Sequence, residues 1–189
     1  MEHSIKYFGL NNIALENDLR RVARDKKIQL RPSRTKSARD AYYAQISEHI
    51  RHDAAVMAKH YELFYSLEIA IRDTIRARLE DIDKDNWWDK YVPQFIRDNA
   101  TANKKKETEA GVTARSDDWL SYTNFGELGQ IITSNWPIFS DTFTDQKAVQ
   151  NVIARLNTLR GPIAHCSMLA EDEVVRLQLS LRDWFRLME

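Results

Sequence analysis

Arg160 and His165 stand five residues apart near the C-terminal end of the chain, in the stretch RLNTLRGPIAH (residues 155–165). An imidazole that titrates near neutral pH can take a proton from a hydroxyl or give one to a leaving oxygen, and a guanidinium can hold two phosphate oxygens. RNA supplies its own nucleophile, the 2′-hydroxyl beside each phosphate. The two residue types therefore indicate a chemistry that could cleave RNA without a metal or a covalent enzyme intermediate.

The Gly161-Pro162 dipeptide between them decides whether the two side chains can meet. In an unbroken helix, side chains five residues apart lie about 140° apart around the axis. Gly161 is a weak helix former, and Pro162 clashes with the preceding turn but suits the first position of a new helix. We therefore predict that the helix ends here and that the chain bends, and such a bend can turn both side chains toward one spot. A structural role stays open, because helix C-termini attract basic residues and lone histidines are more often structural.

Two other groups of reactive residue types give weaker indications. His49, His52 and Asp53 share a helix face at spacings of three and four residues, but they lack a further strong ligand, and we interpret them as a solvated face. Cys166 follows His165 directly, and adjacent side chains on a helix point about 100° apart, which argues against a thiol nucleophile. We predict no metal site and no cofactor.

The elements that must position these residues are helices. Helical periodicity runs from Ser37 to about Ile82, which is too long for one ordinary helix, so we expect two helices, or one bent helix, with a joint near residues 51–55. The second half of this run carries the clearest core pattern, at three- and four-residue steps. Its members are Leu63, Phe64, Leu67, Ile71, Ile75 and Leu79.

The rest of the chain also indicates helices and no alternating strand. We expect a loop over 81–93, a helix near 93–99, a polar and mobile segment over 101–118, and a helix over 124–139 that is broken at Pro137. Further helices are expected over 145–160 and 171–187, the last with acidic residues in its first turn, as the helix dipole prefers. The predicted fold is all-α, a helical bundle whose core lies after about residue 55.

Composition bounds the class of protein. The chain has 189 residues, of which 43% are hydrophobic, so it can form one domain with a sizeable core, or one domain and an appendage. A single cysteine excludes an internal disulfide and fits a reducing compartment. No apolar run reaches the roughly 20 residues of a membrane span, and the N-terminus MEHSIKYFGL lacks a signal-peptide pattern. We predict a soluble cytoplasmic protein that does not bind a membrane.

The N-terminal part concentrates positive charge, although the formal net charge of the chain is zero. A first helix is predicted from Ile13, followed by a linker at Pro32 and Ser33. Only Asp25 opposes the basic residues in this window, so we predict a strip that binds RNA phosphates, with a solvated arm as the alternative interpretation. The strip comprises Arg20, Arg21, Arg24, Lys26, Lys27, Arg31, Arg34, Lys36 and Arg39.

The sequence also resembles a known family. LNTLRGPIAH is similar to the signature of the HEPN superfamily (higher eukaryotes and prokaryotes nucleotide-binding), in which an arginine precedes a histidine by four to six residues. The flanking segments resemble the branch typified by the Swt-one endoribonuclease and by abortive-infection proteins. These segments are HYELFYSLEIAIRDTI, NWWDKYVP, YTNFGELGQIITSNWPIF and RLQLSLRDWF. The resemblance covers roughly residues 57–189, so we expect an HEPN-like helical domain there and an N-terminal basic helical extension over 1–56.

What the resemblance implies is a helical domain that dimerises so that the motifs of two subunits meet in one cleft. Many members are metal-independent endoribonucleases of phage defence, toxin systems or RNA processing, which leave a 2′,3′-cyclic phosphate and a 5′-hydroxyl. Carried onto this chain, His165 would be the general acid/base and Arg160 the phosphate clamp. Glu68 and Arg72 would orient them, unless they form a plain intrahelical ion pair. The implied partners are RNA, with tRNA among the candidates, a second copy of the chain, and an antitoxin or defence-system protein.

One position departs from the family pattern. The family most often has Asn or Asp directly after the arginine, and this chain has Gly161, which lacks a polar side chain that could position substrate. Members without a full motif commonly serve as nucleic-acid-binding or dimerisation modules. A non-catalytic RNA-binding module is therefore the alternative to the ribonuclease, and a subunit that binds a protein partner through an apolar face is a third hypothesis.

Overall fold

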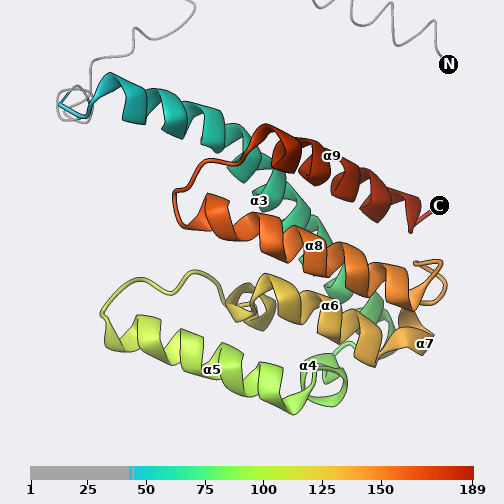
Figure 1. Ribbon diagram of the computed structural model, residues 1–189. Coiled ribbons are helices and arrows are strands. Elements are labelled where there is room, and N and C mark those ends of the chain that lie inside the picture. Colours follow the sequence, from blue (N-terminus) through green and yellow to red (C-terminus); the bar gives the residue numbers. More distant parts are fainter. Residues whose placement is uncertain (1–42, 44) are drawn as a thin grey trace, which may run out of the picture. The chain divides into compact units, whose positions relative to one another are not determined.

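The structure is a computed structural model that describes residue 43 and residues 45–189. Within these residues all regular structure is helical, which confirms the predicted all-α fold (Figure 1). The chain divides into two compact units at residues 50 and 51, and the second unit is described below. The elements are α3 (Glu48–Ile82), α4 (Trp87–Tyr91), α5 (Gln94–Glu109), the 3₁₀-helix η1 (Trp119–Tyr122), α6 (Phe125–Ser134), α7 (Trp136–Phe139), α8 (Gln146–Ala164) and α9 (Glu171–Arg186). The helix predicted from Ile13 lies outside the described residues.

Helix α3 is continuous over 35 residues, so the joint expected near residues 51–55 is absent there. The helix begins at Glu48, directly after a non-helical stretch at residues 45–47. Neither glycine nor proline occurs between its ends, and the chain therefore has no residue that would break it. The predicted core residues from Phe64 to Leu79 are buried. Leu63 is the exception and is 41% exposed, because it lies about 100° around the axis from Phe64.

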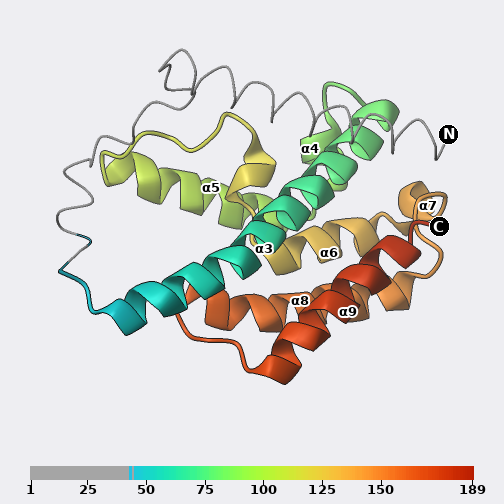
Figure 2. The ribbon, with the colours of Figure 1, turned by 90° about the horizontal axis from the view of Figure 1, so that it is seen from above.

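The remaining long helices pack on one another and on α3. Helix α6 packs against α8, and α8 packs against α9. Both views show α3 crossing α6 and α8 obliquely (Figures 1 and 2). At the α6–α8 contact, a Cβ added to Gly129 would lie only 2.8 Å from Cγ2 of Ile153, so the two helices approach through the missing side chain. The core of this bundle holds both α8 and the middle of α3 in fixed positions.

Residues 81–118 differ from the sequence-based expectation. The predicted loop contains the short helix α4, and the segment predicted to be polar and mobile is helical as far as Glu109. Polar contacts hold this part of α5 to η1: Asn103 Nδ2 donates to the carbonyl oxygen of Tyr122 at 2.9 Å, and Lys104 Nζ lies 4.4 Å from the centre of the Trp119 ring. An apolar pattern could not reveal a helix that is anchored by an amide and an ammonium group.

The break near Pro137 and the last helix agree with the sequence-based expectations. The expected break near Pro137 is confirmed, since α6 ends at Ser134 and Pro137 lies in the first turn of α7. The last helix is confirmed as α9, with acidic residues in its first turn. In the part of the chain that the structure describes, no helix combines the length and apolar content that crossing a membrane requires.

Candidate active site

The C-terminal end of α8 carries the Arg160–His165 motif, and it does not end where the sequence predicted. The helix continues through Gly161 and Pro162 to Ala164, so no new helix begins at Pro162 and the predicted break is wrong. Pro162 has no N–H, so α8 lacks the one internal hydrogen bond that this residue would donate, and the helix nevertheless continues for two more residues. The end is closed instead at Cys166, which has φ 56°, and Ser167 N donates to the carbonyl oxygen of Pro162 at 2.8 Å. These features form a Schellman motif, with a cysteine where glycine is usual.

Arg160 is held in place by a carboxylate of α3. Its Nε lies 3.4 Å from Oε2 of Glu68, whose side chain is only 13% exposed, whereas that of Arg160 is 41% exposed. The other oxygen of Glu68, Oε1, accepts a hydrogen bond from Nη2 of Arg72 at 2.5 Å. Glu68 therefore joins two arginines from different helices. Among residues 45–189, neither terminal nitrogen of Arg160 makes a hydrogen bond, so both can donate to a ligand.

Arg72 has a different role from Arg160. Its side chain is 12% exposed, its Nε donates to the carbonyl oxygen of Leu120 at 2.9 Å, and its Nη2 also donates to that of Thr123 at 3.2 Å. The intrahelical pair with Glu68 is therefore part of a larger arrangement that attaches the segment 120–123 to α3. Arg72 is committed to structural contacts, and Arg160 is the arginine that is able to bind substrate.

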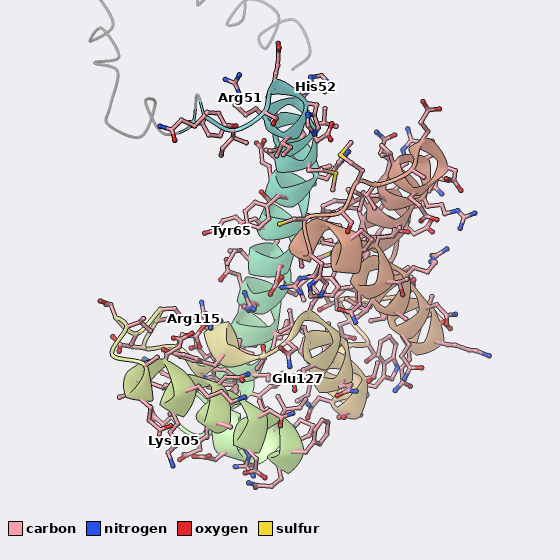
Figure 3. All side chains as sticks on the ribbon, turned by 60° about the vertical axis from the view of Figure 1, so that its left-hand side comes forward. Arg51, His52, Tyr65, Lys105, Arg115 and Glu127 are labelled. Atoms are coloured by element: carbon pink, nitrogen blue, oxygen red, sulfur yellow. The ribbon has the colours of Figure 1, made fainter. Side chains whose placement is uncertain are left out.

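A cavity of about 350 Å³ opens between α3, η1 and the end of α8. Its charged lining residues are three arginines and one glutamate, so the cavity favours an anion. Figure 3 shows Tyr65 projecting from the side of α3, with Arg115 on the same side of that helix. The lining residues that could contact a ligand are Tyr61, Tyr65, Glu68, Arg72, Arg115 and Arg160.

Arg115 is the lining residue that sequence reasoning missed most completely. Its guanidinium pairs with the carboxylate of Glu107, and the hydrogen bond from Arg115 is the main reason why the pKa of Glu107 is lowered. The guanidinium carbon also lies 5.3 Å from the centre of the Tyr122 ring. These contacts fix Arg115 at the cavity margin. Nothing in the sequence indicated this role, because Arg115 lies in a polar stretch where apolar residues do not recur at a regular spacing.

His165 lies outside this cavity. It is exposed, it caps the C-terminal end of α8, and it is not among the residues that line the cavity. Because α8 passes unbroken through Gly161, the backbone does not turn His165 toward Arg160. The chain thus brings Glu68, Arg72 and Arg160 together and leaves His165 exposed at the end of α8. Within 4 Å of a Cβ added at Gly161 there is no atom, so this position has room for a larger side chain.

The predicted basic strip from Arg20 to Arg39 lies outside the described residues. Across residues 45–189, no group of three or more histidine, cysteine, aspartate or glutamate side chains is placed to hold a metal ion. His49, His52 and Asp53, which share a face of α3, are not such a group.

Comparison with known proteins gives one match. The model of a family described as Swt1-like HEPN matches residues 62–189, a range that includes Glu68, Arg72, Arg115, Arg160 and His165. No curated protein and no solved structure matches the chain.

Proposed function

The chain belongs to the Swt1-like HEPN family, and from this membership we propose that it is a metal-independent endoribonuclease. In this proposal it cleaves RNA to a 2′,3′-cyclic phosphate and a 5′-hydroxyl. Arg160 holds the scissile phosphate, and His165 acts as the general acid/base. Glu68 is a positioning residue for Arg160, and Arg72 positions Glu68.

The observation that carries the proposal is the arrangement around Arg160. A carboxylate that is 13% exposed lies beside its Nε, Arg160 is one of three arginines that line the cavity, and among residues 45–189 its terminal nitrogens make no hydrogen bond. A guanidinium whose Nε is held by a carboxylate can use its two terminal nitrogens to bind two phosphate oxygens in one plane. Such a donor can stabilise the charge that develops on the phosphate during cleavage.

The chemistry explains why a second subunit is part of the proposal. Cyclisation moves the proton from the 2′-hydroxyl to a base as the 2′-oxygen attacks phosphorus, and the bond to the 5′-oxygen breaks as an acid protonates that oxygen. This step uses one neutral and one protonated imidazole. We propose a homodimer in which exposed His165 side chains of two copies supply both, beside the phosphate that Arg160 holds.

The biological setting is proposed on the family alone. A role in phage defence or in a toxin-like system fits a ribonuclease of this family, with cytoplasmic RNA, including tRNA, as the substrate. An antitoxin or another defence-system protein is the expected protein partner.

The first prediction concerns His165. Purified protein incubated with total RNA and tRNA in EDTA is expected to produce fragments with cyclic-phosphate ends. Because loss of one general acid/base costs about 10²- to 10⁴-fold in rate, His165→Ala should nearly abolish cleavage. His52→Ala, which removes another exposed histidine, is the matched control and should cleave like the parent protein. Equal cleavage by the His165→Ala variant and the parent would refute the assignment.

A non-catalytic RNA-binding module is the second candidate, and Gly161 is the observation that favours it. Where the family most often has a polar side chain, this chain has none. In that case RNA stays intact in the presence of the protein, and binding weakens steeply as salt concentration rises, because bound phosphates release their counterions.

A further inference from the structure

The aromatic rings at the edge of the cavity suggest what kind of RNA it takes. We propose that Tyr61 and Tyr65 form a stacking platform for an unpaired base of the strand whose phosphate Arg160 holds. The preferred substrate is then single-stranded RNA or an unpaired loop. This inference rests on the proposed function and adds a substrate class to it.

The two tyrosines form an exposed pair. Tyr61 is 59% exposed and Tyr65 is 60% exposed, and their ring centroids are 6.2 Å apart with an angle of 36° between the planes. A single exposed aromatic side chain is ordinary on a protein surface. These two rings contact each other, and both line the cavity that Arg160 also lines. Together they offer an aromatic surface next to the proposed phosphate clamp.

Helix geometry places this pair in line with the charged groups. Positions 61, 65, 68 and 72 of α3 fall within an arc of about 60° around the helix axis and extend about 16 Å along it. The rings therefore lie on the same stripe as Glu68 and Arg72, toward the N-terminal end of α3. Arg160 meets this stripe at Glu68. A strand with a phosphate on Arg160 can extend along the stripe and lay a neighbouring base on the rings.

Stacking selects unpaired nucleotides for a physical reason. Bases inside a duplex already stack on their neighbours, whereas bases in single strands and loops can be splayed out onto aromatic side chains. The volume of about 350 Å³ falls at the lower end of the range for small-ligand sites, roughly 300–1,000 Å³, and thus suits one nucleotide and not a helix.

The mixed character of the lining favours RNA over a protein partner. Tyrosine rings line the same cavity as three arginines, and the terminal nitrogens of Arg160 make no hydrogen bond among the described residues. An apolar protein surface would leave those donors without partners, at a cost in free energy. A nucleotide supplies both a ring and an anion.

The test measures binding separately from cleavage. In a His165→Ala background, the protein is mixed with a short single-stranded RNA that contains the fluorescent base 2-aminopurine. Tyr65→Ala should weaken binding about 5- to 100-fold and reduce the quenching of the base, since stacking of one base on an aromatic ring is lost. Tyr65→Phe should bind like Tyr65, and Tyr65→Leu should bind like Tyr65→Ala. The same RNA annealed to its complement should bind more weakly and should not respond to these changes.

Phe185→Ala is the matched control, because Phe185 on α9 is 57% exposed and does not line the cavity. It should leave binding unchanged. Unchanged binding by Tyr65→Ala overturns the platform, and the proposed ribonuclease still stands if cleavage depends on His165. The platform is also overturned if Tyr65→Leu binds RNA like the parent while Tyr65→Ala alone dissociates the dimer. That result would assign the tyrosine pair to a protein interface. Failure of the unsubstituted protein to bind or cleave RNA overturns both proposals.

Discussion

At the scale of single residues, Glu68 is the group on which the cavity depends most. Its two oxygens contact Arg72 and Arg160, and Arg72 in turn holds the backbone of residues 120–123. Removing the negative charge leaves two guanidinium groups close together without their shared partner. A single carboxylate thus supports both the wall of the cavity and the orientation of the proposed phosphate clamp.

Glu68→Gln is therefore expected to lower the free energy of unfolding by about 1–3 kcal/mol, the range for a hydrogen bond to a charged group. Urea denaturation measures this change. Glu62→Gln is the control, since Glu62 lies exposed on the same helix and should change stability by less than about 0.5 kcal/mol. Equal midpoints for the two variants would mean that Glu68 does not support the fold.

The candidate residues could be predicted from the sequence only in part. Residue types indicated Arg160 and His165, and the family resemblance indicated Glu68 and Arg72; the structure places three of these four at one cavity. Tyr61 and Tyr65 could also have been predicted to lie near Glu68, since they precede it on one helical face at spacings of seven and three residues. The break that could have turned His165 toward Arg160 was predicted wrongly, because α8 continues through Gly161 and Pro162.

At the scale of elements, the contact between α6 and α8 sets the position of the motif. Gly129 permits this contact, since a Cβ there would lie 2.8 Å from the side chain of Ile153. Real Cβ atoms do not approach side-chain carbons so closely, and a larger residue must push the helices apart. Because Arg160 lies on the C-terminal part of α8, such a shift would also move it relative to Glu68.

Gly129→Ala is expected to lower the free energy of unfolding by about 1–3 kcal/mol through overpacking. Gly126→Ala tests the same substitution on the same helix with space available, because its Cβ would come no closer than 3.5 Å to another atom. It should be neutral or stabilising by up to about 1 kcal/mol, as the unfolded chain loses conformational freedom. Thermal or urea unfolding of both variants gives the comparison, and equal stability would argue against close helix packing at Gly129.

Apolar periodicity predicted the elements that contribute to the core and missed those held by polar contacts. It identified the buried face of α3 and placed α6, α8 and α9. It gave no indication that α5 extends to Glu109, where Asn103 and Lys104 supply the anchoring contacts. A hydrogen bond between the side-chain amide of Asn103 and the distant carbonyl of Tyr122 produces no periodic pattern in the sequence.

At the scale of the whole molecule, the described unit places its proposed acid/base group outside its own phosphate site. His165 is exposed and does not line the cavity that Arg160 lines. In the proposed mechanism, a second copy of the chain supplies the missing acid/base group. The family membership could be predicted from sequence segments along residues 57–189. The position of His165 outside the cavity could not, because it depends on where α8 ends.

The activity per molecule is accordingly expected to fall on dilution. Below the dissociation constant of the dimer, the cleavage rate should vary with the square of the protein concentration, and above it in direct proportion, by mass action. Initial rates over a dilution series, with sedimentation at the same concentrations, check this expectation. A rate that stays proportional to concentration where only single chains sediment would show that one subunit suffices.

The ion pair between Glu68 and Arg160 joins segments that lie far apart in the chain, and this separation matters while the protein is being made. Helix α3 leaves the ribosome well before α8, and domains fold as units once their parts are available. Until α8 has been synthesised and has docked, the cavity has no Arg160 and no wall on that side. A nascent chain in which α8 has not yet been synthesised and docked therefore lacks the proposed phosphate clamp.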